Sequence, residues 1–476
     1  MSSKILSALN SDITELTRLT QNALQGGNGG ELYLADAWSF AISMSLGIVT
    51  APDISFGAGG ALRRINDATA DMLTFASLDP AYLKTAAKNM QGISQGTAPS
   101  VKIATAGTMG QGYYTDQDIL GGVKIYEFQP KAEALMREID AYARKDSRVT
   151  NVGISLSVSS KDILIVRADG KHVVDKRPMS SLNVSVTLED NGKKENGGKG
   201  MACPVSVDTL FNKATWQKFV DHAINHAHNN LTAIDAPSGD DFDLIVANGW
   251  GGVIMHEAFG HGLEADFHQK GIAAFQGMLG QRIASKGVTI IDDGTIQNAR
   301  GSLNVDDEGN PTNRNILVDD GILVGLMTSE ISAAKLGMPV TGNARRQGYA
   351  YQPIPRMTNT FIDNGNASVE DLIAGVKKGI LVTEFGGGQV DITSGTFEFN
   401  TTQARLIQNG KLGAYIKGAS LCGQGKTAFQ HITGVANDLE ISVTGSCGKD
   451  GQSLAVTVGQ PTIAVGAGAI TVGGTA

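Results

Sequence analysis

The chain has 476 residues, of which 41% are hydrophobic and 18% are charged. That is the composition of a folded protein of two or three domains rather than of a disordered chain. The formal net charge of −8 argues against a broad basic surface, and so against binding to nucleic acid through the phosphate backbone.

The sequence also lacks signals for membrane insertion or export. No uncharged apolar run reaches the roughly 18 residues of a membrane span, and the first residues have neither the apolar core nor the cleavage site of a signal peptide. The three cysteines, Cys203, Cys422 and Cys447, are too few and too widely spaced for a disulfide framework. We therefore expect a cytoplasmic protein with at least one cysteine available as a thiolate.

The first part of the chain predicts a mixture of helices and strands. Apolar residues fall on one face of a helix over 3–24. Strand-like runs, separated by Gly and Pro, follow between 31 and 63. Further helices are expected over 80–93 and over 130–145, the second with Pro130 at its start.

Residues 152 to 188 predict a run of hairpins. Four segments have the composition or alternation of strands: 152–158, 162–167, 172–176 and 182–188. A tight turn is expected at Ala168-Asp169-Gly170. The charged, glycine-rich segment 192–200 is expected to be a loop.

A domain boundary is expected shortly after this region. A predicted helix over 207–230 is followed by the helix-breaking stretch 235–241, then by a strand over 242–249 and mainly by strands and turns beyond it. The sequence therefore predicts an α+β fold. Residues 1–235 would form an N-terminal α/β domain with helices on an antiparallel sheet, and residues 236–476 a β-rich, barrel-like domain.

The most informative motif places His256, Glu257 and His261 within six residues. Neutral imidazole is a good zinc ligand. A glutamate beside the first histidine can face a metal-bound water, whose pKa zinc lowers towards about 7, and can take its proton. The motif therefore suggests a hydrolytic zinc site in the C-terminal domain.

The spacing of the two histidines needs a local distortion. They are five residues apart, and on a regular helix five steps leave side chains roughly 140° apart. Gly260 and Gly262 flank His261, so a π-type widening or a helix end could bring the imidazoles together. The zinc hypothesis therefore predicts a distorted helix at 258–262. Otherwise the histidines are ordinary polar residues on two helix faces.

A third ligand is required, and the residues leave several candidates open. These are Cys447, Cys422, Glu264, Asp266, His268 and His431. Cys447 lies between glycines that allow close backbone approach, and Lys449 would favour its thiolate. Glu264 and Asp266 could instead orient an imidazole. Cys203 and Cys422 fit best as small buried hydrophobes.

A second histidine group lies at His222, His226 and His228. The first two have the i, i+4 spacing that suits a metal on a helix. No glutamate follows the first histidine, and the polar neighbours are typical of a solvated helix end. We therefore favour a surface helix with cationic character near its C-terminus.

Several motifs in one order resemble a known family. They are HEAFGHGLEADF, TIIDDGT, NVDDEGNP, PVTGNARRQGYAYQPIPRMTNTF, FGGGQVDITSGTFEF and SCGKDGQSLAVTVGQPT. Over about residues 236–476 the chain strongly resembles the TldD branch of the TldD/PmbA metalloproteases, also called modulators of DNA gyrase. The N-terminal half resembles the family only weakly.

The resemblance implies roles for particular residues. His256 and His261 correspond to two zinc ligands, Glu257 to the catalytic base and Cys447 to the third ligand. The implied activity is zinc-dependent hydrolysis of unfolded or extended peptides. The implied assembly is a dimer with a related subunit that lacks the zinc motif, around an enclosed chamber. A His-His-Cys set suits zinc better than iron or manganese.

Two further segments could contact substrate. Arg345, Arg346 and Tyr349 could stabilise the tetrahedral oxyanion, or could be structural. The glycine-rich run containing Gly387 and Gln389 could let a substrate strand add to a sheet edge, or could be a turn between strands.

Two rival functions stay open on sequence alone. One is a non-catalytic regulator that binds partner proteins, although such a protein does not need Glu257 beside two histidines. The other is a zinc hydrolase acting on small amides.

Overall fold

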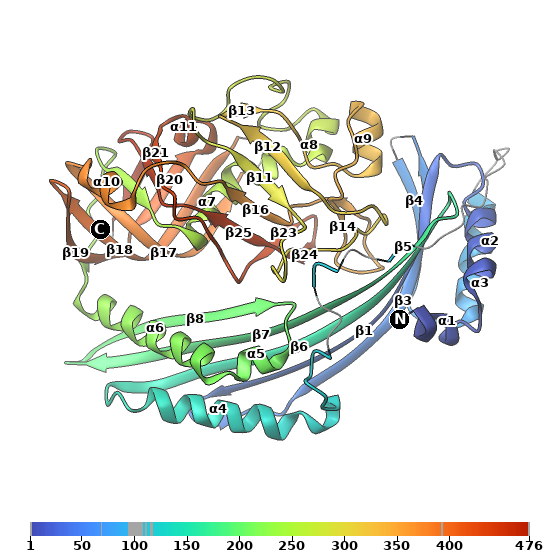
Figure 1. Ribbon diagram of the computed structural model, residues 1–476, viewed down its shortest axis with the longest axis horizontal. Coiled ribbons are helices and arrows are strands. Elements are labelled where there is room, and N and C mark those ends of the chain that lie inside the picture. The colour runs from blue at the N-terminus through green and yellow to red at the C-terminus, as the bar shows by residue number, and fades with distance from the viewer. Residues whose placement is uncertain are drawn as a thin grey trace.

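The computed structural model describes residues 2–67, 69–93, 108–109, 112–114, 118–391 and 394–474. A long, curved antiparallel sheet from the N-terminal half lies along a β-rich body formed by the C-terminal half (Figure 1). This arrangement confirms the predicted α+β class. The boundary at 235/236 stays a prediction.

The N-terminal sheet has the order β4-β3-β1-β6-β7-β5, with β2 paired to β1 and β8 to β7. Its strands are β1 (Gly29–Ser45), β2 (Ile48–Val49), β3 (Asp53–Asn66), β4 (Thr69–Phe75), β5 (Thr108–Met109), β6 (Val149–Arg167), β7 (His172–Asp190) and β8 (Lys193–Cys203). The hairpin β6–β7 turns at the predicted residues 168–170. The four short strands expected around it are two strands of 19 residues each, because the alternation of buried and exposed side chains runs through both.

One face of this sheet forms a core with helices. Side chains such as Ile154, Leu156 and Val184 pack in a single cluster with α4 (Gln129–Ala143), α5 (Val207–Phe211) and α6 (Lys213–Thr232). The alternate positions are small or polar, and Ser155, Ser157 and Asn183 are exposed. A cavity lined by both Ser155 and Trp250 places this polar face towards the C-terminal body.

Two predicted helices are interrupted. The helix expected over 3–24 is α1 (Ser2–Ala8) and α2 (Ile13–Ala23), because Asn10 takes a positive φ of 46° and Asp12 caps the second helix. The helix expected over 207–230 breaks at Asn212, whose side chain accepts a hydrogen bond from the Ala214 N–H. Helix α3 (Pro80–Ile93) and α4 lie within one or two residues of their predicted bounds.

The loop predicted over 192–200 is wrong, since these residues lie in strand β8 and its turn. The glycines that suggested a loop allow the strand to pack closely against a helix. A Cβ on Gly197 would lie 2.0 Å from the carbonyl oxygen of Ala223 on α6, so only glycine lets this strand pass under the helix.

No helix within the described ranges is long and apolar enough to cross a membrane.

The C-terminal body contains two large sheets and two hairpins. The nine-stranded sheet contains β9 (Ile234–Asp235), β10 (Asp243–Val246), β17 (Lys378–Val390), β18 (Thr396–Gln408), β19 (Lys411–Lys417), β20 (Ser420–Gln424), β21 (Ile432–Val435), β26 (Ile463–Val465) and β27 (Ile470–Gly473). The six-stranded sheet contains β11 (Ile290–Asp293), β12 (Arg314–Asp319), β13 (Ile322–Leu323), β16 (Asn359–Ile362), β22 (Glu440–Ile441) and β25 (Thr457–Gln460). The hairpins are β14 (Ala344–Arg345) with β15 (Ile354–Pro355), and β23 (Ser446–Lys449) with β24 (Gln452–Ala455). The strands of the described ranges form open sheets, without the closed barrel that a barrel-like domain suggests.

Short helices complete the body and enclose its core. They are α7 (Val253–Met255), α8 (Ala265–Lys270), α9 (Glu330–Leu336), α10 (Val369–Ala374) and α11 (Gly425–Gln430). Met255, Phe259 and Leu263 are fully buried in the largest apolar cluster of the body. The segment that carries the histidine motif is therefore anchored in the core rather than on the surface.

A buried ion-pair network joins the sheet to the body. Arg63 on β3 pairs with Glu31 on β1 at 2.8 Å and with Glu308 of the body at 2.6 Å. Arg346 of the body pairs with the same Glu31. Removing one partner of such a network would leave an uncompensated buried charge, which is costly. The network therefore holds the two parts in one fixed relation.

Candidate metal centre

The histidine motif lies in a distorted helical segment, as its spacing requires. A π-helical turn covers His256–Gly260 and a 3₁₀ turn covers His261–Leu263. The N–H of His261 donates to the carbonyl oxygen of His256, an i to i+5 hydrogen bond. The wider turn brings both imidazoles to one side, with ring centroids 5.3 Å apart. The predicted distortion is confirmed.

Packing explains why glycine occupies the end of the π turn. A Cβ on Gly260 would lie 2.1 Å from the Sδ atom of Met357, which is fully buried. On the neighbouring face Phe259 packs against Phe275 and Phe429, with centroid distances of 4.8 and 4.3 Å. The segment therefore has little room to shift.

We expect Gly260→Ala to destabilise the protein by about 1–3 kcal/mol, because the added methyl group overpacks the core against Met357. Chemical denaturation measures the free energy of unfolding. Gly92→Ala in α3 is the matched control, since nothing lies within 4 Å of a Cβ there. Equal stability of the two variants would contradict this account of the turn.

Cys447 approaches the two histidines from the hairpin β23–β24. His256, His261 and Cys447 each offer one possible ligand atom, and these three atoms all lie within 4.8 Å of one another. The Sγ atom lies 3.3 Å from Nε2 of His261. All three residues are buried. Within the described ranges these residues form the one such group of possible metal ligands.

The charges at these three residues favour a metal-binding thiolate. Burial alone would raise the pKa of Cys447, but His256 and His261 outweigh it and lower the pKa to about 4. Burial would lower the pKa of His261, but Glu264 and Cys447 raise it to about 10. Because only neutral imidazole binds a metal, binding here would release that proton.

A buried polar layer orients the ligands. His261 donates from Nδ1 to Glu264 at 2.9 Å, which leaves Nε2 directed at Cys447. Burial would raise the pKa of Glu264, but Lys449 and His261 lower it to about 2. Lys449 donates to Glu264 at 2.9 Å and to Asp266 at 2.7 Å. Partners of this kind fix the tautomer and direction of a ligating imidazole.

Glu257 lies beside the histidines without being fully buried. Its side chain is 21% exposed, and its Oε2 atom lies 3.9 Å from Nε2 of His261. Burial raises its pKa above the usual value, and the two histidines partly oppose the rise. A carboxylate with a raised pKa and access to solvent is suited to accept and return a proton.

The residues present fit a zinc ion. Two imidazoles and a thiolate are the ligand types that zinc prefers, and three protein ligands are typical of catalytic sites. The Nδ1 atom of His256 is buried and has no hydrogen-bond partner in the described part of the chain. A bound ligand or a water molecule would satisfy this atom.

The other candidate third ligands make different contacts. His268 contacts the carbonyl oxygen of Gly262 at 2.9 Å, and the exposed His431 contacts that of Thr427 at 2.8 Å. Cys422 is half-buried on β20. Cys203 is buried, and burial raises its pKa to about 11. Glu264 accepts hydrogen bonds from His261 and Lys449, and Asp266 accepts one from Lys449, as described above.

The second histidine group lies on α6, where it contacts the body. His222 lies 3.1 Å from Glu384, and His226 lies 3.2 Å from the carbonyl oxygen of Thr402. His228 contacts Arg148 at 3.0 Å. The rings of His222 and His226 lie 6.2 Å apart, whereas His228 contacts Arg148, so the three histidines do not meet at one point.

The four predicted substrate contacts fall into two places. Tyr349 is half-buried against Tyr33 and its neighbours on the N-terminal sheet. Arg345 is buried and donates to the carbonyl oxygens of Met357 and Ala455. Gly387 and Gln389 are exposed on β17. Beyond Val382, this strand pairs with β18 alone among the described strands.

Two arginines around Cys447 were missed by the sequence analysis. Arg356 is fully buried and donates to the carbonyl oxygen of Cys447 at 2.6 Å. Arg300 donates to the carbonyl oxygen of Gly445 at 2.6 Å. Both lie far from Cys447 in sequence. The charged side chain inside the otherwise apolar and polar PIPRMTNTF run was the one available signal for Arg356.

Comparison with known proteins places this chain in a family. Residues 239–474 match the model of the PmbA/TldA metallopeptidase C-terminal domain, and residues 126–231 match that of the central domain. The chain is 45% identical over 347 residues to a metalloprotease TldD homolog of Haemophilus influenzae, covering 72% of this chain and 71% of that protein. It is 42% identical to a TldD homolog of Buchnera aphidicola from Acyrthosiphon pisum, covering 74% and 73%.

Solved structures share the fold at low sequence identity. TldE from Thermococcus kodakarensis superposes with a TM-score of 0.75 at 18% identity, covering 97% of this chain and all of that one. A Thermotoga maritima protein described as a modulator of a DNA gyrase gives a TM-score of 0.75 at 17% identity, covering 97% and 100%. At these identities the likeness concerns the fold alone.

The matching domains and the curated relatives define a metallopeptidase. Because the family models cover most of the chain and a relative at 45% identity is covered over more than two thirds, the chain belongs to the TldD/PmbA family of metallopeptidases. The predicted family and enzyme class are confirmed, and the non-catalytic regulator is not favoured.

Proposed function

We propose that the protein is a zinc-dependent peptidase that cleaves unfolded or extended peptides. The observation that carries this proposal is the meeting of His256, His261 and Cys447 within 4.8 Å of one another, beside the partly exposed Glu257. The three buried donors would hold the zinc ion. When bound, zinc would lower the pKa of a water molecule and polarise the scissile carbonyl group.

Glu257 would move the protons. As a carboxylate it would accept a proton from the attacking water, and as a carboxylic acid it would return that proton to the leaving amine. The raised pKa of Glu257, which burial causes, supports the role of base, because a more basic carboxylate takes a proton from water more readily. Glu264 and Lys449 would keep His261 in the tautomer that directs Nε2 towards Cys447.

Strand β17 is the proposed docking edge for an extended substrate. Gly387 and Gln389 are exposed, and this half of the strand pairs on one side only among the described residues. A peptide added there would be held by main-chain hydrogen bonds, which depend little on side chains. Tyr349 is less suited to an oxyanion role, since it packs on the N-terminal sheet, whereas Arg345 stays a candidate contact for a negatively charged group.

The family resemblance suggests a dimer with a related subunit that lacks the zinc motif. Native mass spectrometry of the protein isolated from its own cells would detect such a partner. A bare monomer would contradict this part of the proposal.

The substrate class is tested with three substrates: an unfolded polypeptide, the same polypeptide folded, and a small blocked amide. We expect cleavage of the unfolded polypeptide alone, loss of that cleavage after chelation, and recovery on addition of zinc. Cleavage of the small amide alone would favour the amide hydrolase. Absence of cleavage by zinc-loaded protein, tested with and without its partner, would contradict a peptidase.

A further inference from the structure

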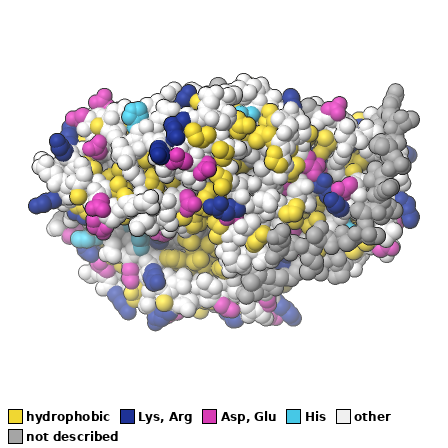
Figure 2. Space-filling model, turned by 45° about the horizontal axis from the view of Figure 1, so that its top comes forward, with side chains coloured by type: hydrophobic (Ala, Val, Ile, Leu, Met, Phe, Trp, Pro, Cys, Tyr) yellow, Lys and Arg dark blue, Asp and Glu magenta, His cyan; other side chains and the backbone are white. Residues whose placement is uncertain are grey.

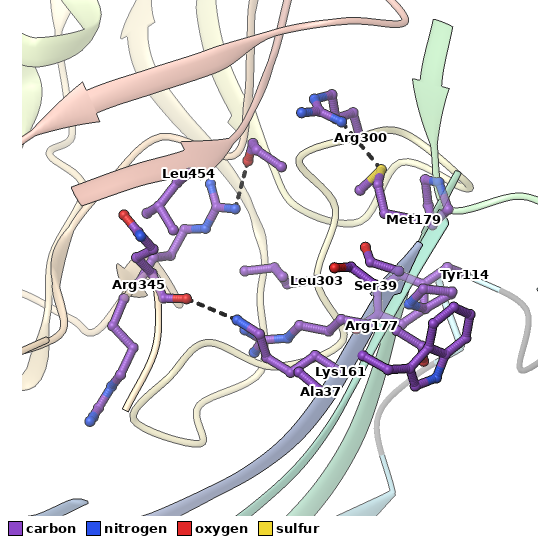
Figure 3. Close-up of a pocket in the computed structure, with 18 of the residues that line it drawn as sticks. Ala37, Ser39, Tyr114, Lys161, Arg177, Met179, Arg300, Leu303, Arg345 and Leu454 are labelled. Atoms are coloured by element: carbon purple, nitrogen blue, oxygen red, sulfur yellow. Dashed lines mark hydrogen bonds between the residues drawn. The ribbon is translucent and has the colours of Figure 1, made fainter. Parts of the chain in front are cut away.

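A cavity of about 440 Å³ lies between the N-terminal sheet and the C-terminal body. Lys161 on β6 and Arg177 on β7 line it from the sheet, and Arg300 and Arg345 line it from the body (Figure 3). Cavities of this size are typical of sites for small ligands or for the end of a larger one. From one side, Figure 2 shows a hollow between the two parts of the molecule, while the lining of the cavity itself is drawn in Figure 3.

Three of the cations that line this cavity contact neutral groups. Lys161 donates to the carbonyl oxygen of Gln347 at 2.9 Å. Arg345 donates to two carbonyl oxygens, including that of Ala455 at 2.7 Å. Arg300 contacts a carbonyl oxygen, the Ser446 hydroxyl and the sulfur of Met179. Within the described ranges, Lys161, Arg300 and Arg345 make no ion pair with a carboxylate.

The one acidic side chain of the lining is already engaged. Asp307 accepts from Arg177 at 2.7 Å and from the backbone N–H of Arg346 at 2.7 Å. Burial, together with the positive charges of Arg177, Arg345 and Arg346, lowers the pKa of Lys161 to about 8 against the opposing effect of Asp307. The cavity therefore holds surplus positive charge, which an anion would stabilise.

The rest of the lining combines serines with apolar side chains. Leu303, Leu454, Met179, Trp38 and Phe56 contribute to it. An inorganic anion would leave these side chains without a partner. A carboxylate attached to an apolar group satisfies both the cations and the apolar walls.

The cavity is next to the proposed metal centre. Leu454 is the direct cross-strand partner of Cys447 in the hairpin β23–β24, and residues so paired have Cα atoms about 4.5–5.5 Å apart. Arg300 also holds the backbone and side chain of 445–446, immediately before Cys447. A peptide whose end lies in the cavity would therefore need only a few residues to reach the catalytic groups.

We propose that this cavity, through Lys161, Arg300 and Arg345, binds the C-terminal carboxylate of a peptide substrate, with Leu303 and Leu454 against its last side chain. The inference rests on the proposed peptidase function and adds a preference for substrates with a free C-terminal carboxylate. Peptides would be anchored by that end, and cleavage would fall near it.

Binding is measured with the full chain carrying Glu257→Gln, so that bound peptide is not consumed. The probe is a short fluorescent peptide with a C-terminal leucine, prepared as the free acid and as the amide. By fluorescence anisotropy we expect the acid to bind at least about tenfold more tightly, the usual scale for a charge-assisted contact. Equal affinities would overturn the proposal, whatever the behaviour of any further variant.

Lys161→Met is expected to remove the preference for the acid, whereas Lys194→Met should keep it. Lys194 lies on β8 with its side chain 63% exposed, paired with Glu189, so this control matches the change in charge. Inorganic phosphate provides a second arm. Phosphate that binds to the cavity more tightly than the peptide acid would overturn the assignment to substrate in favour of a free anion.

Failure of this proposal is separable from failure of the proposed function. Equal binding of acid and amide, together with zinc-dependent cleavage by the unsubstituted chain, would remove only the carboxylate site. Absence of any cleavage would count against the peptidase itself.

Discussion

Cys447→Ser is expected to lower zinc affinity by at least about 100-fold, so that the purified variant carries little zinc. Loss of groups that merely orient a ligand already costs about 10–100-fold in metal affinity, and this change removes a ligand atom. The thiolate is also stabilised by His256 and His261, a property that a serine hydroxyl lacks. Zinc per chain, measured by mass spectrometry, tests the expectation.

Cys203→Ser is the matched control for this experiment. Cys203 is also buried, but it lies on β8 and its Sγ contacts the carbonyl oxygen of Val443 at 3.8 Å. We expect this variant to retain about one zinc per chain. Stoichiometric zinc in Cys447→Ser would keep a metallopeptidase but would place its third ligand elsewhere. Circular dichroism of both variants would exclude loss of fold as the cause.

The fold was predictable where local chemistry decides the structure. Alternating residues in the segment 152–158 predicted a strand, and Pro130 marked the start of a helix that begins one residue earlier, at Gln129. The prediction was wrong where a segment distant in the sequence determines the local structure. The glycines at 192–200 read as a loop, although Gly197 is there because α6 passes directly over β8.

The candidate site was likewise predictable only in part from the sequence. The i, i+5 spacing predicted the helical distortion from geometry, since no regular helix places His256 and His261 together. Cys447 was chosen among several candidates through the family resemblance rather than through spacing. Arg300 and Arg356 act on the backbone beside Cys447 from segments that only the tertiary fold brings near. A single sequence contains no local signal for such contacts.

Glu257→Gln is expected to keep the zinc and to lower turnover of an unfolded peptide by about 10²–10⁴-fold, the usual contribution of general acid–base catalysis. Glutamine has nearly the same shape but cannot accept the proton of water. Zinc content should change little, because Glu257 lies outside the group of three donors, with Oε2 3.9 Å from Nε2 of His261. Steady-state cleavage rates and zinc analysis on the same samples test both parts.

Glu138→Gln on α4 is the control, because that side chain is 54% exposed and lies on a helix of the N-terminal half. Its turnover should equal that of the unsubstituted chain. Full turnover in Glu257→Gln with bound zinc would require another base, and Glu264 could not supply it, since it is fully buried and already accepts from His261 and Lys449. Loss of zinc in Glu257→Gln would instead mean that the carboxylate helps to hold the metal. The two readouts together therefore separate proton transfer from metal binding at one residue.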